Sequence, residues 1–271
     1  MNAKSDREGY DNVYDLFNAP VMRQVREEAY GEDIGQHSWV TSEDLACDIA
    51  LLRLSADSRL LDLGCGPCGP LSYIANKTGC RAMGLDASPE AIIEGKRRSD
   101  SLGLSTRVTL LQADLNAPLS LPDSSFEAVI SLDVLLHLKD RQGLFREAAR
   151  VLAPGGRFLF TDAAVITGPV SDVEVQKRAT FGPVQLAPPG WNERLLVGAG
   201  FRMLQQQDRT ATLLKTATGR LAARNRHRQD LEKLETSVGF DRQQAYLETV
   251  VSLSERGALS RIMYLADLSE A

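Results

Sequence analysis

The sequence predicts an α/β protein with a doubly wound, mostly parallel sheet. Five short apolar runs recur along the first 163 residues, and they lack the two-residue alternation of strands that face water on one side. Helical stretches with start and stop signals separate several of these runs, and a glycine-rich turn follows the first. Such alternation of strands and helices calls for parallel strands joined by right-handed crossovers.

The expected strands are the apolar runs at 59–65, 81–88, 107–115, 126–134 and 156–163. The helix after the second run has Ser88 as its cap and Pro89 at its first position, and it stops at Gly103. Another helix, within 140–156, should stop at Pro154-Gly155-Gly156.

The rhythm changes after residue 163. Residues 166–190 contain four prolines and should form mostly loop or short helix. We then expect a helix from Trp191 to near Gly198 or Gly200, a strand over 202–212, helices over 215–258 and a last strand over 260–268. For 271 residues, one domain with an inserted or appended cap is the natural expectation.

The composition is that of an ordinary soluble globular protein, with 43% hydrophobic and 25% charged residues. A net charge of −5 argues against a nucleic-acid-binding surface over the whole protein. The N-terminal stretch lacks the apolar core of a signal peptide, and no run reaches the ~18–20 apolar residues that span a bilayer. Four cysteines are too few for a disulfide-stapled domain. We expect a cytoplasmic protein with reduced thiols and no nucleic-acid or membrane partner.

The segment LLDLGCGPCGP at 60–70 admits two chemistries. Cys65 and Cys68 form the Cys-x-x-Cys pattern of thioredoxin-like oxidoreductases. Gly64, Gly66 and Gly69 have the spacing of a nucleotide-binding turn. At least four strands in parallel-type order follow the loop, more than a thioredoxin-like unit requires.

The nucleotide interpretation makes a demand that can be checked further along the chain. An acidic residue should end the next strand about 20 residues on, where it can accept both ribose hydroxyls. Asp86 ends the second expected strand, 22 positions after Gly64. The loop has no Lys or Arg for a phosphate, and Asp62 precedes its first glycine. This acid suits S-adenosylmethionine, whose ammonium and sulfonium groups are both positive.

Residues 58–163 resemble the class I S-adenosylmethionine-dependent methyltransferases through five motifs in order. LLDLGCGPCGP matches their first motif, GLDAS the second, and LQADL carries Asp114, which in the family approaches the adenine amino group. FEAVISLDVLLHL matches the fourth strand, and REAARVLAPGGRFLFTD matches the helix, turn and fifth strand. The resemblance implies a Rossmann-like seven-stranded sheet, mostly parallel with its last strand antiparallel, plus a helical substrate cap.

This organisation divides the chain into an N-terminal helical segment covering the site at 1–57, a cofactor-binding core at 58–214, a helical cap insertion at 215–259 and the last core strand at 260–271. The cofactor would be S-adenosylmethionine, with S-adenosylhomocysteine as product, and no metal is expected. The expected cofactor-binding residues are Ser38, Asp62, Gly64, Cys65, Gly66, Gly69, Asp86, Ala87, Ala113, Asp114, Leu115, Leu132 and Asp133.

Within this superfamily the chain looks most like small-molecule N-methyltransferases that act on phosphoethanolamine or on sarcosine and dimethylglycine. In the phosphobase enzymes, a His at the matching HL position pairs with a Tyr from the N-terminal segment. His137 fits the first role, and Tyr14 or Tyr10 fits the second. The tyrosine-rich phosphate pocket of those enzymes is largely missing, because after Asp162 the chain reads AAVITGPV. That departure speaks against a phosphobase acceptor.

His137 is the candidate general base, because a substrate hydroxyl or ammonium must lose its proton and an imidazole is suited to accept it. The alternative is a histidine that hydrogen-bonds locally and shapes the pocket. Arg178 and Trp191 are candidate substrate residues, a cation for a carboxylate or phosphate and an aromatic for an amine or apolar body.

The stretch at 215–228 holds five Lys or Arg residues and no acid. Arg220, Arg224 and Arg228 repeat every four residues, which indicates one solvated face of a helix. A clamp for an acidic substrate is the alternative.

The sequence therefore predicts an enzyme that transfers a methyl group to N or O of a small metabolite. A thiol-disulfide oxidoreductase centred on Cys65 and Cys68 and a catalytically inactive S-adenosylmethionine-binding protein remain as alternatives. The net charge and the lack of an appended basic domain argue against RNA as the acceptor. SLDVLL stands where base- and glutamine-directed enzymes carry an Asn-Pro-Pro-Tyr-type sequence.

Overall fold

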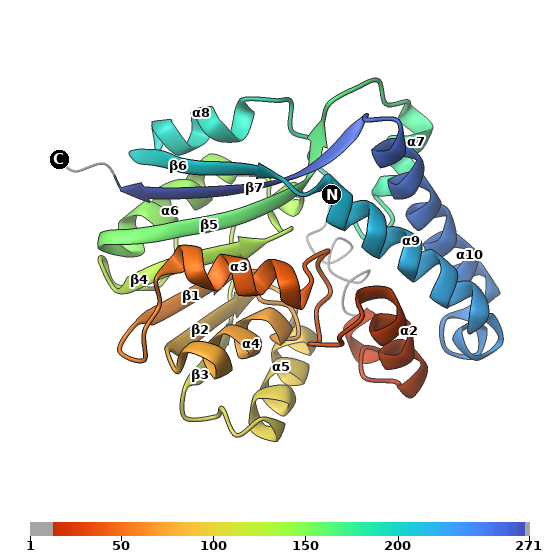
Figure 1. The fold of residues 1–271 in the computed structure, drawn as a ribbon, viewed down its shortest axis with the longest axis horizontal. Helices are drawn as coiled ribbons and strands as arrows, with labels where there is room; N and C mark the ends of the chain where they lie inside the picture. Colours follow the sequence, from red (N-terminus) through yellow and green to blue (C-terminus); the bar gives the residue numbers. More distant parts are fainter. Residues whose placement is uncertain (1–12, 269–271) are drawn as a thin grey trace.

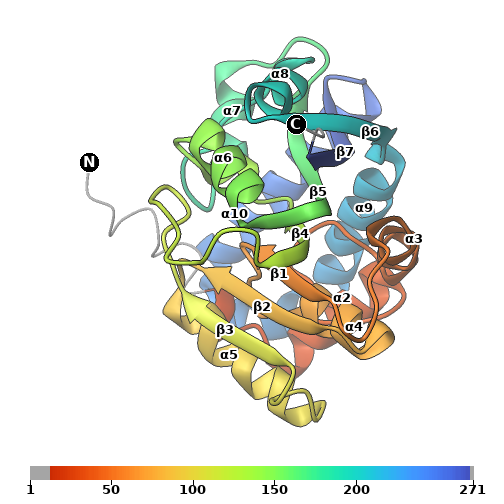
Figure 2. The same ribbon diagram turned by 90° about the vertical axis from the view of Figure 1, so that its left-hand side faces the viewer.

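The computed structural model describes residues 13–268, which are built around one seven-stranded sheet (Figure 1). The strands are β1 (Arg59–Leu63), β2 (Arg81–Asp86), β3 (Val108–Gln112), β4 (Phe126–Leu132), β5 (Leu152–Ile166), β6 (Phe201–Asp208) and β7 (Leu259–Leu268). They lie in the order β3-β2-β1-β4-β5-β7-β6. The first five pair in parallel, and β7 is antiparallel to both of its neighbours. The predicted fold class is confirmed, and Figure 2 shows how the sheet twists from β3 to β6.

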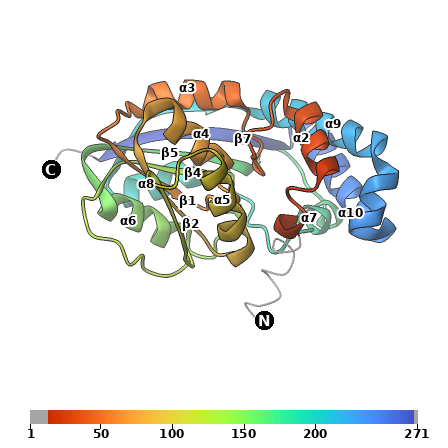
Figure 3. The same cartoon turned by 90° about the horizontal axis from the view of Figure 1, so that it is seen from below.

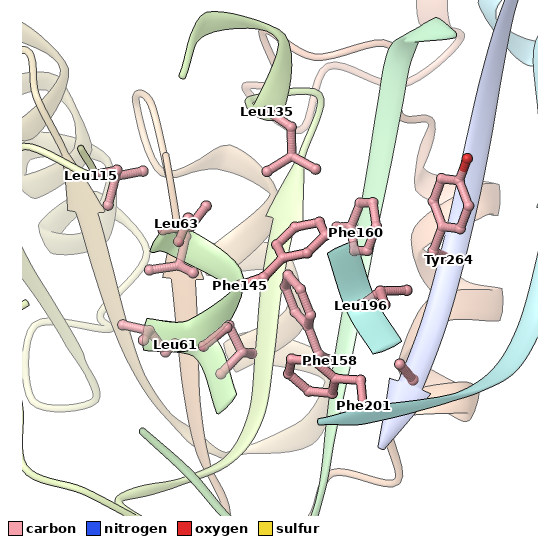
Figure 4. Packing of buried hydrophobic residues seen from close by; sticks show 14 of the residues in the cluster. Leu61, Leu63, Leu115, Leu135, Phe145, Phe158, Phe160, Leu196, Phe201 and Tyr264 are labelled. Carbon is pink, nitrogen blue, oxygen red and sulfur yellow. The ribbon is translucent and has the colours of Figure 1, made fainter. Parts of the chain in front are cut away.

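Helices cover both faces of this sheet (Figure 3). On one face pack α3 (Ser42–Leu52), α4 (Gly69–Thr78) and α5 (Pro89–Ser101), and on the other α6 (Arg141–Val151) and α8 (Trp191–Gly198). Under α6 and α8 the core is aromatic, with Phe145, Phe158, Phe160 and Phe201 in contact (Figure 4). Strands buried on both faces need apolar residues at every position, which explains the missing alternation.

Four further helices form a cap at the end of the sheet where the parallel strands terminate (Figure 1). They are α2 (Pro20–Tyr30), α7 (Asp172–Arg178), α9 (Thr210–Arg226) and α10 (Arg228–Glu255). Val21 and Val25 of α2 pack with Ala223 of α9 and Phe240 of α10. A short helix, η1 (Leu135–His137), follows β4. None of the described helices combines the length and the apolar character needed to cross a bilayer.

Local signals fix several boundaries of these elements. The Ser88 hydroxyl accepts a hydrogen bond from the Ala91 N–H at 3.2 Å and caps α5, as expected for a serine before a helix. The helix α6 ends at Val151, three residues before the expected stop at Pro154. The strand β5 is longer than expected and starts at Leu152, where it pairs with Phe126 of β4.

Candidate functional site

A cavity of about 280 Å³ lies at the carboxyl ends of the parallel strands, beneath the cap. This is the edge where open α/β sheets collect their ligands. The structure brings the following predicted site residues to this one cavity: Tyr14, Ser38, Asp62, Gly64, Cys65, Gly66, Asp86, Ala87, Asp114, Leu115, Leu132, Asp133 and His137.

Only glycine can occupy the first position of the glycine-rich turn after β1. Gly64 has φ +86°, and a Cβ placed there would lie 2.4 Å from the Val134 side chain. Gly66 has φ +51°, and its N–H donates to Asp86 Oδ2 at 2.8 Å. The turn therefore binds the end of β2 directly.

Asp86 is held in one orientation at the carboxyl end of β2. Oδ2 accepts from Gly66, and Oδ1 accepts from the Ser88 N–H at 2.9 Å. The side chain is half-buried and lines the cavity. A carboxylate accepts hydrogen bonds from hydroxyl groups, and this one is fixed at the wall of the cavity.

Asp62 is a buried carboxyl group at the cavity, with only 3% of its surface exposed. Within residues 13–268 its side chain has no hydrogen-bond or ion-pair partner. Burial, and then the neighbouring charge of Asp86, raise the pKa of Asp62 to about 8. A cationic ligand group would supply the partner that this carboxyl lacks.

Ser38 gives a second sign of ligand space at this cavity. Its Oγ atom is buried and has no hydrogen-bond partner among the described residues. The Ser38 carbonyl, in contrast, accepts a bond of 2.8 Å from the Tyr30 hydroxyl, which anchors the segment to α2. The residues present therefore fit a ligand with cationic and polar groups.

Asp133 follows β4 in a left-handed conformation, with φ +60°. Its carboxylate accepts from the Trp39 N–H at 3.0 Å, the Thr161 hydroxyl at 2.8 Å and Arg261 Nε at 2.9 Å. These bonds hold the strained backbone and tie the segment around Trp39 to the sheet. Asp133 lines the cavity, but its carboxylate already accepts hydrogen bonds from groups of the protein.

Two histidines in the lining are neutral at pH 7. Burial is the main cause that lowers the pKa of His137 to about 4 and that of His37 to about 3, and nearby guanidinium groups add to both effects. His137 Nδ1 lies 3.4 Å from the Pro183 carbonyl oxygen. The ring of Tyr14 packs edge-on against His37, with centroids 5.6 Å apart. A neutral imidazole has one nitrogen that can accept a proton.

Comparison with known proteins bears on the central part of the chain. Residues 61–160 match a family model described as a methyltransferase domain. Over these residues the chain is similar to that domain. The predicted resemblance is confirmed, and the relatives and solved structures below agree with S-adenosylmethionine as the predicted cofactor.

The names of the chain's relatives point to different acceptor atoms. A sterol 24-C-methyltransferase of Eremothecium gossypii is 29% identical over 70% of this chain and 48% of its own. A 27-O-demethylrifamycin SV methyltransferase of Amycolatopsis mediterranei is 31% identical over 59% of each chain. A sarcosine/dimethylglycine N-methyltransferase of Halorhodospira halochloris is 34% identical over 41% of this chain and 39% of its own. The chain thus spans only 39 to 59% of the length of these relatives.

Solved structures share the fold over most of the chain. Phosphoethanolamine N-methyltransferase 2 of Haemonchus contortus, in complex with phosphomonomethylethanolamine and S-adenosylhomocysteine, has a TM-score of 0.80 at 18% identity, over 97% of this chain and 61% of that one. The [4+2]-cyclase SpnF has a TM-score of 0.73 at 20% identity, over 98% and 95% of the two chains. A putative sarcosine dimethylglycine methyltransferase of Galdieria sulphuraria has a TM-score of 0.72 at 20% identity, over 83% and 82%. At such identities the likeness concerns the fold alone.

Several predicted site residues lie away from this cavity. Arg178 is 2% exposed and donates to the Tyr246 hydroxyl at 2.9 Å and to the Ala163 carbonyl at 3.2 Å. Trp191 packs against the core, and the Arg141 guanidinium lies 4.9 Å from its ring centroid. Neither side chain lines the cavity, because the protein itself surrounds both.

Two other predicted cofactor-binding residues, Gly69 and Ala113, are also absent from the lining. A Cβ on Gly69 would lie 2.1 Å from the Gly35 carbonyl oxygen, so this glycine permits close packing of the N-terminal segment on α4. Tyr10 lies outside the described residues.

The solvated helix face predicted for the 215–228 stretch is wrong for two of its three arginines. Arg224 is 3% exposed and forms an ion pair with Glu235, because α10 folds back on α9. Arg220 lines the cavity, and only Arg228 is exposed. Spacing identified one helix face but not the elements that cover it.

One side of the cavity has an aromatic wall that sequence reasoning missed. Trp39 and Tyr246 stack with ring centroids 6.3 Å apart, and Phe181 meets Tyr246 edge-on at 5.2 Å. All three line the cavity. These residues come from three separate segments, and no motif links them.

The cysteines of the glycine-rich turn do not have the environment of a redox centre. Both Cys65 and Cys68 are free and buried. Burial raises the pKa of Cys65 well above its ordinary value and that of Cys68 to about 12. Reactive thiols need a lowered pKa and access to solvent, so this environment argues against the oxidoreductase alternative.

Proposed function

We propose that this protein transfers the methyl group of S-adenosylmethionine to nitrogen or oxygen of a small-molecule acceptor. The observation that supports the proposal is the pair of carboxyl groups beside the glycine-rich turn. Asp86 is fixed where ribose hydroxyls can donate to it, and Asp62 is a buried acid without a protein partner. A neutral sugar and a cationic amino-acid tail are the ligand groups that suit these two environments.

In this proposal each part of the donor has a place in the cavity. Asp86 binds the ribose, Asp62 the ammonium group, and Asp114 lies near the adenine amino group, with Leu115 and Leu132 as apolar walls. When bound, S-adenosylmethionine supplies an activated methyl group on a positively charged sulfur. The chain has to orient the acceptor, keep water out and accept the acceptor's proton.

Orientation is the larger catalytic contribution of the chain. Holding an acceptor in line can lower a barrier by roughly 7–11 kcal/mol at most. The aromatic wall of Trp39, Phe181 and Tyr246 restricts how an acceptor enters. Such a wall also excludes water from the methyl group.

Proton removal from the acceptor falls to His137 in this proposal, with Tyr14 from the N-terminal segment closing the same cavity. The lowered pKa keeps His137 neutral and able to accept a proton at pH 7. A base with a pKa of about 4 suits an acceptor whose proton is already acidic. The N-terminal segment and the 215–259 helices serve as covers for the site.

Binding of S-adenosylhomocysteine, measured by calorimetry, tests the proposal. We expect micromolar affinity for the wild type and a loss of about a hundredfold for Asp86→Ala, because two hydroxyl bonds to a carboxylate disappear. Asp57→Ala removes the same charge at an exposed loop position and should leave the affinity unchanged. A wild type that does not bind S-adenosylhomocysteine would refute the proposal.

Transfer of a labelled methyl group to a panel of small metabolites then separates an enzyme from a protein that only binds the cofactor. Incorporation into one acceptor supports the methyltransferase. Tight cofactor binding without incorporation across the panel favours the inactive alternative. We also propose a cytoplasmic location, since the four cysteines are free thiols, as is usual in a reducing compartment.

A further inference from the structure

The cap brings a guanidinium group to the cavity without a carboxylate to balance it. Arg220 of α9 lines the cavity, and its guanidinium lies 5.0 Å from the centroid of the Trp39 ring. Among residues 13–268 no acidic side chain forms an ion pair with it. The aspartates of the lining, in contrast, all come from the ends of sheet strands or the loops that follow them.

The buried arginines of the described chain differ from Arg220, which is partly exposed, in that most of them have an ionic partner. Of the six that are less than 9% exposed, five form an ion pair: Arg26 with Asp33, Arg141 with Asp162, Arg209 with Asp48, Arg224 with Glu235 and Arg261 with Asp133. The sixth is Arg178, which donates to the Tyr246 hydroxyl and leaves its Nε atom buried without a partner. Tyr246 belongs to the aromatic wall, so the second unbalanced guanidinium lies directly behind the same side of the cavity.

These two charges make the acceptor side of the cavity electropositive. Their field reaches the histidines of the lining, since Arg220 contributes to the lowered pKa of His37 and Arg178 to that of His137. The aromatic side chains around them lower the local polarity and so strengthen the field. A cationic amine would be repelled there, whereas a carboxylate or phosphate would be attracted.

The donor has a carboxylate of its own, so the position of Arg220 decides between two sources of the anion. Arg220 also lines a second cavity of about 430 Å³, together with His37 and Phe181. No residue of the glycine-rich turn borders that second cavity. Arg220 therefore borders space that the glycine-rich turn does not reach.

We propose that Arg220 binds a carboxylate or phosphate group of the methyl acceptor, and that the acceptor is therefore an anionic small molecule. This inference rests on the proposed function. Arg178 acts as a positioning residue, because it holds the Tyr246 hydroxyl and adds positive potential without reaching the cavity.

The test titrates inorganic phosphate, as a probe anion, into protein saturated with S-adenosylhomocysteine at constant ionic strength. Thermal stabilisation gives the phosphate dissociation constant. We expect this constant to rise about tenfold or more in Arg220→Gln, because a charge-assisted contact is lost, and to rise less in Arg220→Lys. Lys215→Gln removes the same charge from an exposed position on the same helix and should change it less than about twofold. Equal phosphate binding by wild type and Arg220→Gln would overturn the inference, as would a wild type that phosphate does not stabilise.

A second arm compares S-adenosylhomocysteine with 5′-methylthioadenosine, which lacks the amino-acid tail. We expect Arg220→Gln to bind both as the wild type does. If it loses affinity for S-adenosylhomocysteine alone, Arg220 holds the donor's carboxylate and the inference is wrong. If the wild type binds neither nucleoside, the proposed function itself fails, and the inference falls with it.

Discussion

Replacing Asp62 by Asn should remove a proton that the wild type releases when it binds the donor. The pKa of Asp62 is raised to about 8 by burial and by the charge of Asp86. At pH 7 about 0.9 of the molecules therefore carry a protonated Asp62 before binding. A bound ammonium group stabilises the carboxylate, so this proton leaves on binding.

Calorimetry in buffers of different ionisation enthalpy counts the released protons. We expect the wild type to release about 0.9 proton more than Asp62→Asn when S-adenosylhomocysteine binds at pH 7. The variant should also bind more weakly, by about tenfold or more, since it cannot form the ion pair. A difference below about 0.2 proton, with equal affinities, would refute the assignment of Asp62 to the ammonium group.

The same substitution should change how the stability of the free protein depends on pH. The folded pKa lies above the unfolded value of 3.8, so the folded state binds more protons between pH 3.8 and 8. The contribution of Asp62 to stability is thus complete below pH 3.8 and is lost as pH rises through 8. The loss is about 1.4 kcal/mol per pH unit within the window. Urea denaturation between pH 5 and 8 should show this decline in the wild type only, and equal slopes would contradict the buried, unpaired state of the group.

Three further predictions follow from the local geometry. Gly64→Ala should destabilise the fold by about 1–3 kcal/mol more than Gly103→Ala does. Both glycines have positive φ, but only at Gly64 would an added Cβ meet a side chain within 4 Å. Equal urea midpoints of the two variants would refute this. His137→Asn should flatten the rise of stability with pH between 4 and 6.5. The lowered pKa of His137 means that the stability contributed by the neutral ring is complete above pH 6.5 and is lost as pH falls toward 4. An unchanged slope of stability against pH in urea denaturation would contradict this. Iodoacetamide should label the exposed Cys47 and spare Cys65 and Cys68 in the native protein at pH 8. Mass spectrometry detects the modified cysteines. Early modification of either buried thiol would support the redox alternative.

The sequence by itself determined the sheet and the glycine-rich edge of the cavity. Strand positions, the Ser88 cap and the glycine bend follow from patterns within short windows, because backbone preferences and burial on both sheet faces act locally along the chain. Asp86 could be placed beside Gly66 because the carboxyl ends of neighbouring parallel strands meet at one edge. The start of β5 could not be placed, since its pairing with Phe126 outweighs the stop signal at Pro154.

Only the tertiary structure decided the aromatic side of the cavity. Arg178 and Arg220 are both arginines on cap helices, yet one is enclosed behind Tyr246 and the other reaches the cavity. Arg224, one turn beyond Arg220, is buried against Glu235. Spacing along a helix says which side chains share a face, but the charge balance of that face depends on which distant segments pack over it. The side chains on this part of the cavity were therefore set by long-range packing, which no local pattern encodes.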